Sequence, residues 1–464
     1  MRASIPRSSL AAMLTLAGCS SDDTFACQDD QACEGVGPLG QCEPSGYCSF
    51  ADANCSESGR RYGTLAGNGL AGMCIDPGGM TEGPPGTAET GGPPPSDEGT
   101  GDPDDTGPTS GPTSEPTSEP WWDCQWAARR RLTIEPSGLD DVLWGVPVLI
   151  VLDDTRIDPS IMAPTGRDLR FVTDDDTVLP YEIEQWSPTG LSWIWLYLPQ
   201  LDPAGVSINM YYGEPDAVGI DGSAVWDEYL GVWHMGPGLA DATGLNQLDE
   251  VETTDTVTGH IASAQQCDRN HEGIRSLPSR TLGDLFVQGG TVSAMVRATS
   301  WGASGRGVIV AQGDDIAGDD GWVFMLNDDR EALRFGRGFT DDTGTWYSAE
   351  GSVSLYTWHH VAVVYEDFAI PVDREPAFYV DGVQQPISES EPPEGKPETF
   401  YDEFLFFGGD LGSSSRWFDG LLDEIRLAPV PRSAGWMTVQ AASMRDDLVT
   451  YGPPQSNPCD DPSS

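Results

Sequence analysis

The stretch from residue 417 to residue 436 constrains the fold more than any other part of this chain. Read as a β-strand, its side chains alternate between two faces. One face carries Leu421, Asp423, Ile425 and Leu427, and the other carries Leu422, Glu424, Arg426 and Ala428. Because Glu424 and Arg426 stand two residues apart and are able to pair, the pattern predicts that the second face is exposed to solvent. It predicts that the first face is buried in a core.

Asp423 is the residue that does not fit an apolar face. A carboxylate on a core-facing row is costly unless it is hydrogen-bonded, paired with a cation or bound to a metal ion. Backbone N–H groups or an arginine would satisfy it, and a structural Ca²⁺ ion is the alternative. Both interpretations favour a binding or scaffolding protein over an enzyme.

Length and charge exclude several classes of function. A chain of 464 residues is too long for one ordinary domain. Its net charge of −50 opposes binding to nucleic acid or to anionic lipid, because both carry phosphate groups. The charge suits a soluble extracellular protein whose surface collects weakly bound Ca²⁺. No apolar run reaches the roughly 18 residues needed to span a bilayer.

The first 19 residues have the pattern of an export signal. Arg2 and Arg7 precede a short apolar run, and small residues precede Cys19. The segment resembles a bacterial lipoprotein signal, which implies that Cys19 is lipidated and anchors the chain in a membrane. Ser20 and Ser21 follow the cysteine, which by the same resemblance implies the outer membrane, with the protein facing the cell exterior. An ordinary signal peptide is the alternative.

Residues 20–76 form a small cysteine-rich module. Its cysteines are Cys27, Cys33, Cys42, Cys48, Cys55 and Cys74. In an exported chain with few apolar residues, this density predicts three disulfides, although six cysteines allow 15 pairings. A zinc cluster is the alternative, and the absence of histidine and of close Cys-x-x-Cys pairs argues against it.

Residues 77–120 and 453–464 are expected to lie outside the folded domains. The first segment is almost entirely Pro, Gly, Thr, Ser, Glu and Asp, and it cannot bury enough apolar area to offset its ordering entropy. We therefore expect an extended acidic linker there and a short tail at the end. Cys124 and Cys459 bracket the folded region, so a disulfide between them would clamp its two ends. Cys267 would then be free or paired elsewhere.

Residues 121–216 are predicted to form a first β-sandwich. Short β-rich runs separated by turn residues lie at 142–152, 169–173, 181–186, 191–198 and 206–212. Trp193, Trp195 and Tyr197 share one strand face. Such aromatic faces are mostly core, and an exposed platform for stacking sugars is the alternative.

This segment resembles a bacterial family known as domain of unknown function 2341. The resemblance rests on Gly166–Phe171, Leu179–Trp186, Trp193-Ile194-Trp195 and Met210-Tyr211-Tyr212-Gly213. It implies a β fold that often precedes a lectin-like domain, and it implies no chemistry.

Residues 225–452 are predicted to form a two-sheet jelly roll. Strand candidates lie at 231–235, 291–298, 307–312, 321–327, 332–336, 358–365, 377–380, 403–407 and 420–427. Asp381-Gly382 indicates a tight hairpin, and helical periodicity is seen only near 434–444. The whole chain is therefore expected to be all-β, with two tandem sandwiches.

The second segment resembles the laminin-G-like, concanavalin A-like lectin/glucanase family. The matching residues are Trp233-His234-Met235, Trp358–Val363, Tyr379–Gly382 and Phe418–Arg426, with Arg432, Ser433, Gly435 and Trp436. The family implies a jelly roll that binds glycans or proteins and is often stabilised by Ca²⁺. By this resemblance, Asp241 and Asp423 would meet at one Ca²⁺ ion.

No catalytic arrangement is evident in the sequence. Glycosidases of this class need two carboxylates facing one cleft. Glu424 is expected on the opposite face from Asp423, and Ile425 holds the alternate position. His359 and His360 project to opposite faces of one strand and are expected to be hydrogen-bonded structural residues. We therefore expect no enzyme activity.

Taken together, the sequence predicts an outer-membrane lipoprotein with a non-catalytic, adhesion-type domain that binds a glycan or a surface protein. A polysaccharide-acting glycosidase or lyase is one alternative, and a structural spacer is another.

Overall fold

The computed structural model describes residues 41–51, 60–62, 75, 120–250, 254–270, 273–277, 282, 285–286, 289–315, 320–367, 375–397, 404–409 and 416–460. The chain divides into two compact units, Met1–Pro112 and Thr113–Ser464. Predictions for the signal segment with Cys19, for Cys27, Cys33, Cys55 and Cys74, and for nearly all of the linker lie outside the described residues. In the part that is described, no helix is long and apolar enough to cross a membrane.

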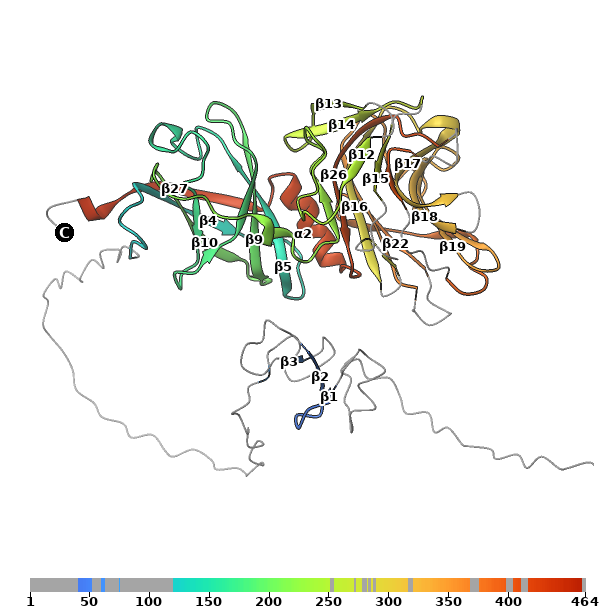
Figure 1. The fold of residues 1–464 in the computed structure, drawn as a ribbon, viewed down its shortest axis with the longest axis horizontal. Coiled ribbons are helices and arrows are strands. Elements are labelled where there is room, and N and C mark those ends of the chain that lie inside the picture. Colours follow the sequence, from blue (N-terminus) through green and yellow to red (C-terminus); the bar gives the residue numbers. More distant parts are fainter. Residues whose placement is uncertain are drawn as a thin grey trace, which may run out of the picture. The chain divides into compact units, whose positions relative to one another are not determined.

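The described residues of the first unit form one small antiparallel sheet. Its strands are β1 (Gln41–Cys42), β2 (Cys48–Ala51) and β3 (Arg60–Tyr62). Cys42 and Cys48 are both disulfide-bonded and stand opposite each other in the register of β1 and β2. The second unit consists of two groups of sheets with a helix between them, as Figure 1 shows.

The first group of sheets, which we call the first β body, is an antiparallel sandwich, as predicted. One sheet has the order β27-β4-β10-β6-β7 and the other the order β5-β9-β8. The strands are β4 (Ala128–Ile134), β5 (Leu143–Leu152), β6 (Arg170–Val172), β7 (Val178–Leu179), β8 (Tyr181–Gln185), β9 (Ser192–Leu201), β10 (Val206–Tyr212) and β27 (Val449–Ser456). Short 3₁₀ turns lie at η1 (Pro159–Ile161) and η2 (Ser223–Trp226).

The C-terminal segment returns to the first β body, which corrects the predicted boundary at residue 452. Strand β27 pairs with β4 from Val449 to Ser456, so it belongs to a sheet of the first body. The predicted boundary divides these residues between the second domain and the C-terminal tail. Cys124 and Cys459 form a disulfide that closes a loop across a sequence separation of 335 residues. Closing so long a loop restricts the unfolded chain and so favours the folded one. The turn η4 (Pro458–Asp460) ends the described chain.

Helix α2 (Ala434–Met444) joins the two bodies and covers an open sheet edge. Ser433 caps its N-terminus by accepting the backbone N–H of Trp436. The hydroxyl of Ser443 accepts the backbone N–H of Leu149 at 2.7 Å, and β5 is the last strand of its sheet. An uncovered edge would leave backbone N–H and C=O groups without partners, and the helix supplies a hydrogen-bond partner to this edge.

The second group of sheets, the second β body, is a two-sheet jelly roll, as predicted. One sheet has the order β13-β14-β26-β16-β21-β22-β23 with β11 also paired to β26, and the other has the order β12-β15-β25-β17-β18-β19-β20-β24. The strands of the first are β11 (Gly231–Trp233), β13 (Asp255–Thr258), β14 (Ser263–Cys267), β16 (Gly290–Ala298), β21 (His359–Tyr365), β22 (Ala377–Val380), β23 (Val383–Gln385) and β26 (Gly420–Ala428). The strands of the second are β12 (Leu248–Glu250), β15 (Ile274–Ser276), β17 (Arg306–Asp315), β18 (Asp320–Asn327), β19 (Ala332–Gly338), β20 (Thr343–Tyr347), β24 (Ser388–Glu391) and β25 (Leu405–Phe407), with the turn η3 (Ala303–Gly305) before β17.

The sheet that contains β26 is buried on both faces. Val361 and Val363 of β21 belong to the core of the jelly roll, whereas Ala362 between them belongs to the core of the first β body. Met295 and Ala428 likewise pack on the first body. A sheet covered on both faces has continuous apolar strands, which explains why β21 shows no alternation of polar and apolar residues.

A β-bulge in β26 overturns the predicted assignment of its faces. The pairing with β16 shifts between Ser293 and Met295, and Glu424 has a φ of 47°. Leu422, Ile425 and Leu427 therefore belong to the jelly-roll core, although a strict alternation would separate Leu422 from the other two. Glu424 and Arg426 do pair, as predicted, but they are buried against the first β body and not exposed.

Candidate binding site at the junction of the two bodies

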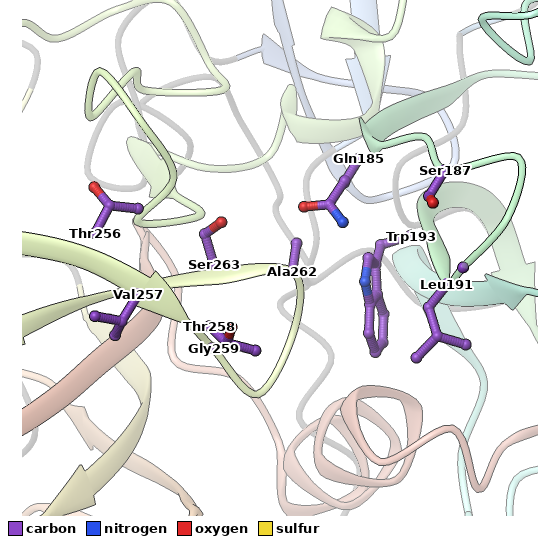
Figure 2. Close-up of a pocket in the computed structure, with 11 residues that line it drawn as sticks. Gln185, Ser187, Leu191, Trp193, Thr256, Val257, Thr258, Gly259, Ala262 and Ser263 are labelled. Carbon is purple, nitrogen blue, oxygen red and sulfur yellow. The ribbon is translucent and has the colours of Figure 1, made fainter.

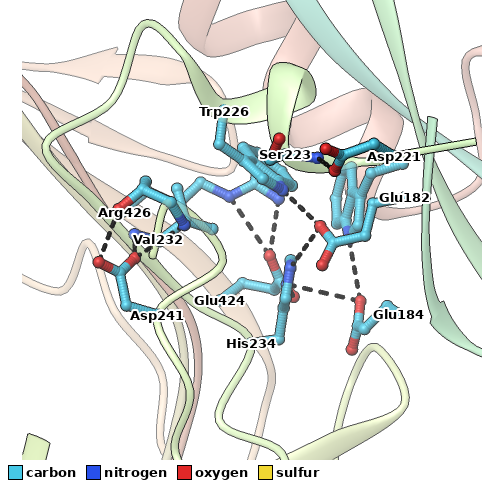
Figure 3. A network of polar contacts seen from close by, with 12 residues as sticks. Glu182, Glu184, Asp221, Ser223, Trp226, Val232, His234, Asp241, Glu424 and Arg426 are labelled. Carbon is cyan, nitrogen blue, oxygen red and sulfur yellow. Dashed lines mark hydrogen bonds and ion pairs between the residues drawn. The ribbon is translucent and has the colours of Figure 1, made fainter. Parts of the chain in front are cut away.

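A largely buried group of charged side chains joins the two β bodies around His234. Glu182 and Glu184 come from β8, Glu424 comes from β26, and His234 directly follows β11. Nδ1 of His234 lies 2.6 Å from Oε1 of Glu424 and 3.6 Å from Oε2 of Glu184. Its Nε2 lies 3.3 Å from Oε2 of Glu182. Figure 3 shows these contacts, of which that between His234 and Glu424 links residues 190 positions apart in the sequence. Both nitrogens of the imidazole therefore face carboxylates.

Two tryptophans hold the carboxylates of β8 in place. The indole N–H of Trp195 donates to Oε2 of Glu184 at 2.9 Å, and the indole N–H of Trp226 donates to Oε2 of Glu182. The Trp195 ring is also stacked on the ring of His234, with an interplanar angle of 14°. Trp195 is thus buried, as predicted for its aromatic row, but it lies against the second β body, whereas Trp193 and Tyr197 of the same row are half-buried.

Arg426 completes the group. Its Nη2 donates to Oε2 of Glu424 at 2.6 Å. Its guanidinium lies 4.1 Å from the ring centre of Trp195 and 4.7 Å from that of Trp226, which are cation–π distances. Because Arg426 is buried, the pairing with Glu424 and the two aromatic rings offset much of the cost of removing its charge from water.

The titration of these groups follows from their surroundings. Burial alone would lower the pKa of His234, but the charges of Glu424 and Glu184 outweigh burial and raise that pKa well above its ordinary value. Burial raises the pKa of Glu184 to about 8, assisted by Glu424. Burial also opposes ionisation of Glu424, yet His234 and Arg426 hold its pKa below the ordinary value.

Asp423 fixes a hairpin of the second β body. Its Oδ2 accepts the backbone N–H groups of His260 and Ile261 at 2.9 and 3.0 Å, in the turn between β13 and β14. The first interpretation of this carboxylate, satisfaction by backbone N–H groups, therefore fits its Oδ2. Gly259 makes the approach possible, because a Cβ there would lie 2.6 Å from the same oxygen.

The predicted calcium site on Asp241 and Asp423 does not fit these contacts. The carboxylate of Asp241 accepts bonds from Val232, Thr243 and Asn246, five in all, and these contacts organise the turn after β11. A carboxylate surrounded by N–H and O–H donors has little lone-pair capacity left for an ion. The two aspartates serve different backbone segments.

A groove of about 680 Å³ opens at the same junction. One wall comes from the end of β8, from Trp193 on β9 and from the loop between these strands, and the other comes from the β13–β14 hairpin, as Figure 2 shows. Its lining residues are Gln185, Ser187, Gly190, Leu191, Trp193, Thr256, Val257, Thr258, Gly259, Ala262 and Ser263. The volume is typical of ligand pockets. None of these residues carries a charge.

The two adjacent histidines of β21 differ. His359 is hydrogen-bonded to Asp381 and to Ser354, in agreement with the prediction of a structural residue. His360 is buried, and neither of its ring nitrogens has a hydrogen-bond partner among the described residues, so the prediction is wrong for His360. Burial, with a contribution from Arg426, lowers the pKa of His360 to about 3.

The matches to family models follow the order of the two bodies. Residues 165–232 match the family Domain of unknown function (DUF2341). Residues 273–436 match the Concanavalin A-like lectin/glucanases superfamily. The chain carries a DUF2341 segment followed by a concanavalin A-like domain. The charged group therefore joins the two matched segments. The DUF2341 segment contributes Glu182, Glu184 and Trp195, and the concanavalin A-like domain contributes Glu424 and Arg426.

Comparison with solved structures gives distant likenesses. The binding domain of Paraclostridial Mosquitocidal Protein 1 is 13% identical, with a TM-score of 0.36, over 47% of this chain and 52% of that chain. Domain 4 of AbnA, an extracellular arabinanase from Geobacillus stearothermophilus solved with arabinotriose, is 16% identical, with a TM-score of 0.31, over 46% of this chain and 98% of that one. This chain thus spans about half the length of the binding domain of Paraclostridial Mosquitocidal Protein 1. At these values the likeness carries no functional argument. No curated protein matches the chain.

Proposed function

We propose that the chain is a surface-anchored protein whose groove binds a neutral oligosaccharide and does not cleave it. The observation that carries this proposal is the groove itself. Trp193 is half-buried in its wall, and the side chains of Gln185, Ser187, Thr256, Thr258 and Ser263 supply uncharged donors and acceptors. An indole face packs against the C–H face of a sugar ring, while amides and hydroxyls bond sugar hydroxyls.

The absence of charge among the lining residues supports a neutral ligand. The chain as a whole carries a net charge of −50, so an uncharged groove of this size stands apart from its surface. An anionic glycan would be repelled by the overall field, and a cationic ligand would find no carboxylate among the lining residues. A neutral polysaccharide fits both conditions.

The positions of the nearby carboxylates support binding without catalysis. A glycosidase needs two carboxyl groups that reach the same substrate. Glu424 is completely buried and is held by His234 and Arg426, and Glu184 is held by Trp195. Neither carboxylate belongs to the groove lining. The pattern of the first 19 residues, with Cys19 at its end, supports the surface anchor.

The groove is tested by glycan binding and by two matched tryptophan variants. The purified chain is applied to an array of neutral and acidic glycans, and the best ligand is then titrated by calorimetry. Trp193→Ala should weaken binding about tenfold or more, equivalent to about 1.4 kcal/mol or more. Trp144→Ala removes a tryptophan that is 63% exposed and outside the groove, and it should leave the affinity unchanged.

Two results would contradict the proposal. One is an array on which no neutral glycan binds, and the other is equal affinity in the two variants. Release of reducing ends from the bound glycan would instead establish an enzyme.

A further inference from the structure

We propose that Glu184, His234 and Glu424 form a binding site for one divalent transition-metal ion, such as Zn²⁺ or Mn²⁺, between the two β bodies. One ligand atom from each residue lies within 4.8 Å of the other two. The site is distinct from the groove, because none of the three residues is among those that line it.

The distances between the donor atoms suit a shared ion. Two ligands bonded to one ion at about 2.0–2.1 Å, at angles of about 90 to 110°, lie about 2.9–3.4 Å apart. Nδ1 of His234 lies 2.6 Å from Oε1 of Glu424 and 3.6 Å from Oε2 of Glu184, which brackets that range. Shifts of a few tenths of an ångström would bring both distances to His234 into that range, and the two carboxylate oxygens, which lie within 4.8 Å of each other, would close on the ion that replaces the proton between His234 and Glu424.

The surrounding contacts fix the orientation of each ligand. Glu182 faces Nε2 of His234, which leaves Nδ1 as the atom available to an ion. The indole of Trp195 donates to Oε2 of Glu184, the same oxygen that would bind the ion and that keeps a second lone pair for it. Arg426 bonds Oε2 of Glu424, while Oε1 faces the imidazole. A carboxylate behind a metal-bound histidine and donors behind metal-bound carboxylates are the usual supports of such sites.

The charges of the group would also be balanced by a bound cation. Glu182, Glu184 and Glu424 bring three carboxylates to the imidazole of His234, and Arg426 pairs with Glu424. With a neutral imidazole and three ionised carboxylates, an ion of charge two takes the place of the protons that His234 and Glu184 otherwise hold. Asp423, the neighbour of Glu424, is also buried and interacts with the charges of Glu184 and Glu424, and its Oδ1 has no hydrogen-bond partner in the described part of the chain. One imidazole nitrogen with two carboxylates favours zinc or manganese, whereas Ca²⁺ prefers six to eight oxygen ligands.

The first test uses the wild-type chain and needs no variant. The purified chain is dialysed against Zn²⁺, Mn²⁺ or Co²⁺, washed, and analysed by plasma mass spectrometry. We expect about one ion per chain, a melting temperature that rises with the ion and falls with chelator, and a visible absorption band for bound Co²⁺. Ca²⁺ should leave the melting temperature unchanged. A chain that retains no ion and melts identically with metal and with chelator would show that the group consists of ion pairs only.

The second test places the ion. Glu184→Gln removes one ligand with little change in shape and should lower retention of the ion at least tenfold. Glu228→Gln alters a half-exposed carboxylate that pairs with Arg432 outside the cluster, and it should retain the ion fully. Equal retention in both variants would place the ion elsewhere and overturn the assignment. If Glu184→Gln fails to fold, the Co²⁺ spectrum decides instead: the wild type should show histidine coordination, and its absence overturns the proposal.

Discussion

At the scale of single residues, Asp423 and Glu424 are neighbours with opposite behaviour. Burial, assisted by Glu424 and Glu184, raises the pKa of Asp423 well above its ordinary value. Glu424 is equally buried, yet His234 and Arg426 hold its pKa below the ordinary value. The difference arises because the bulge turns the two side chains towards different partners, the hairpin turn for Asp423 and the charged group for Glu424.

His360 predicts how stability depends on acid pH. The pKa of His360 is lowered to about 3 in the folded chain, whereas an ordinary histidine has a pKa of 6.5. Between these values the unfolded chain binds a proton at this residue and the folded chain does not, so stability falls as the pH is lowered from 6.5 towards 3. The loss attributable to His360 should reach about 4 kcal/mol.

His360→Leu isolates this contribution. Leucine cannot be protonated and leaves no buried nitrogen without a partner, so the variant should be at least as stable as the wild type at pH 7. Its free energy of unfolding, measured by urea denaturation, should fall less steeply between pH 6.5 and 4. An identical pH dependence in the two proteins would refute the assignment.

At the scale of elements, the β13–β14 hairpin depends on one glycine. A Cβ at position 259 would lie 2.6 Å from Oδ2 of Asp423 and 2.7 Å from the backbone oxygen of Ile261. Gly259→Ala should therefore displace the turn and lower the free energy of unfolding by about 1–3 kcal/mol. It should also weaken glycan binding, because Gly259 lines the groove.

Gly236→Ala is the matched control for the hairpin. A Cβ at Gly236 would meet nothing within 4 Å, so this variant should have the same free energy of unfolding and the same glycan affinity as the wild type. Urea denaturation and calorimetric titration measure both variants. If Gly259→Ala behaved like Gly236→Ala, Asp423 would not be holding the turn as described.

Strand β26 shows how far the sequence predicts such an element. Its position, its pairing of Glu424 with Arg426 and the burial of Asp423 all follow from residue types at a spacing of two. The assignment of side chains to the two faces of β26 does not follow from the sequence, because one bulged residue reverses the alternation and leaves no clear mark in the sequence. The solvent exposure predicted for Glu424 was wrong because the covering surface lies in the first β body, far away along the chain.

The sequence did not predict the charged group around His234, again because its members lie far apart along the chain. Glu182, Glu184 and His234 lie in segments whose family resemblance was recognised, yet nothing local indicates that they meet Glu424. Two charged residues at alternate positions of β8, beside a row of aromatic residues on β9, were the available signal. Polar residues on a strand face next to buried tryptophans suggest a contact with another element, but they do not identify it.

At the scale of the whole molecule, the two β bodies form one unit. Helix α2 and strand β27 return from the second body to the first, and the disulfide between Cys124 and Cys459 fastens the ends. The charged group around His234 fills the junction from within. Because each wall of the groove comes from a different body, the groove exists only while the bodies stay joined.

Hydrogen–deuterium exchange with and without a neutral oligosaccharide selected on the array tests this account most directly. The account predicts slower exchange on binding in two separate stretches, 185–193 of the first body and 256–263 of the second. Both stretches should lose this protection in Trp193→Ala and keep it in Trp144→Ala. Protection confined to one body, or to loops outside the groove, would contradict a binding site built from both.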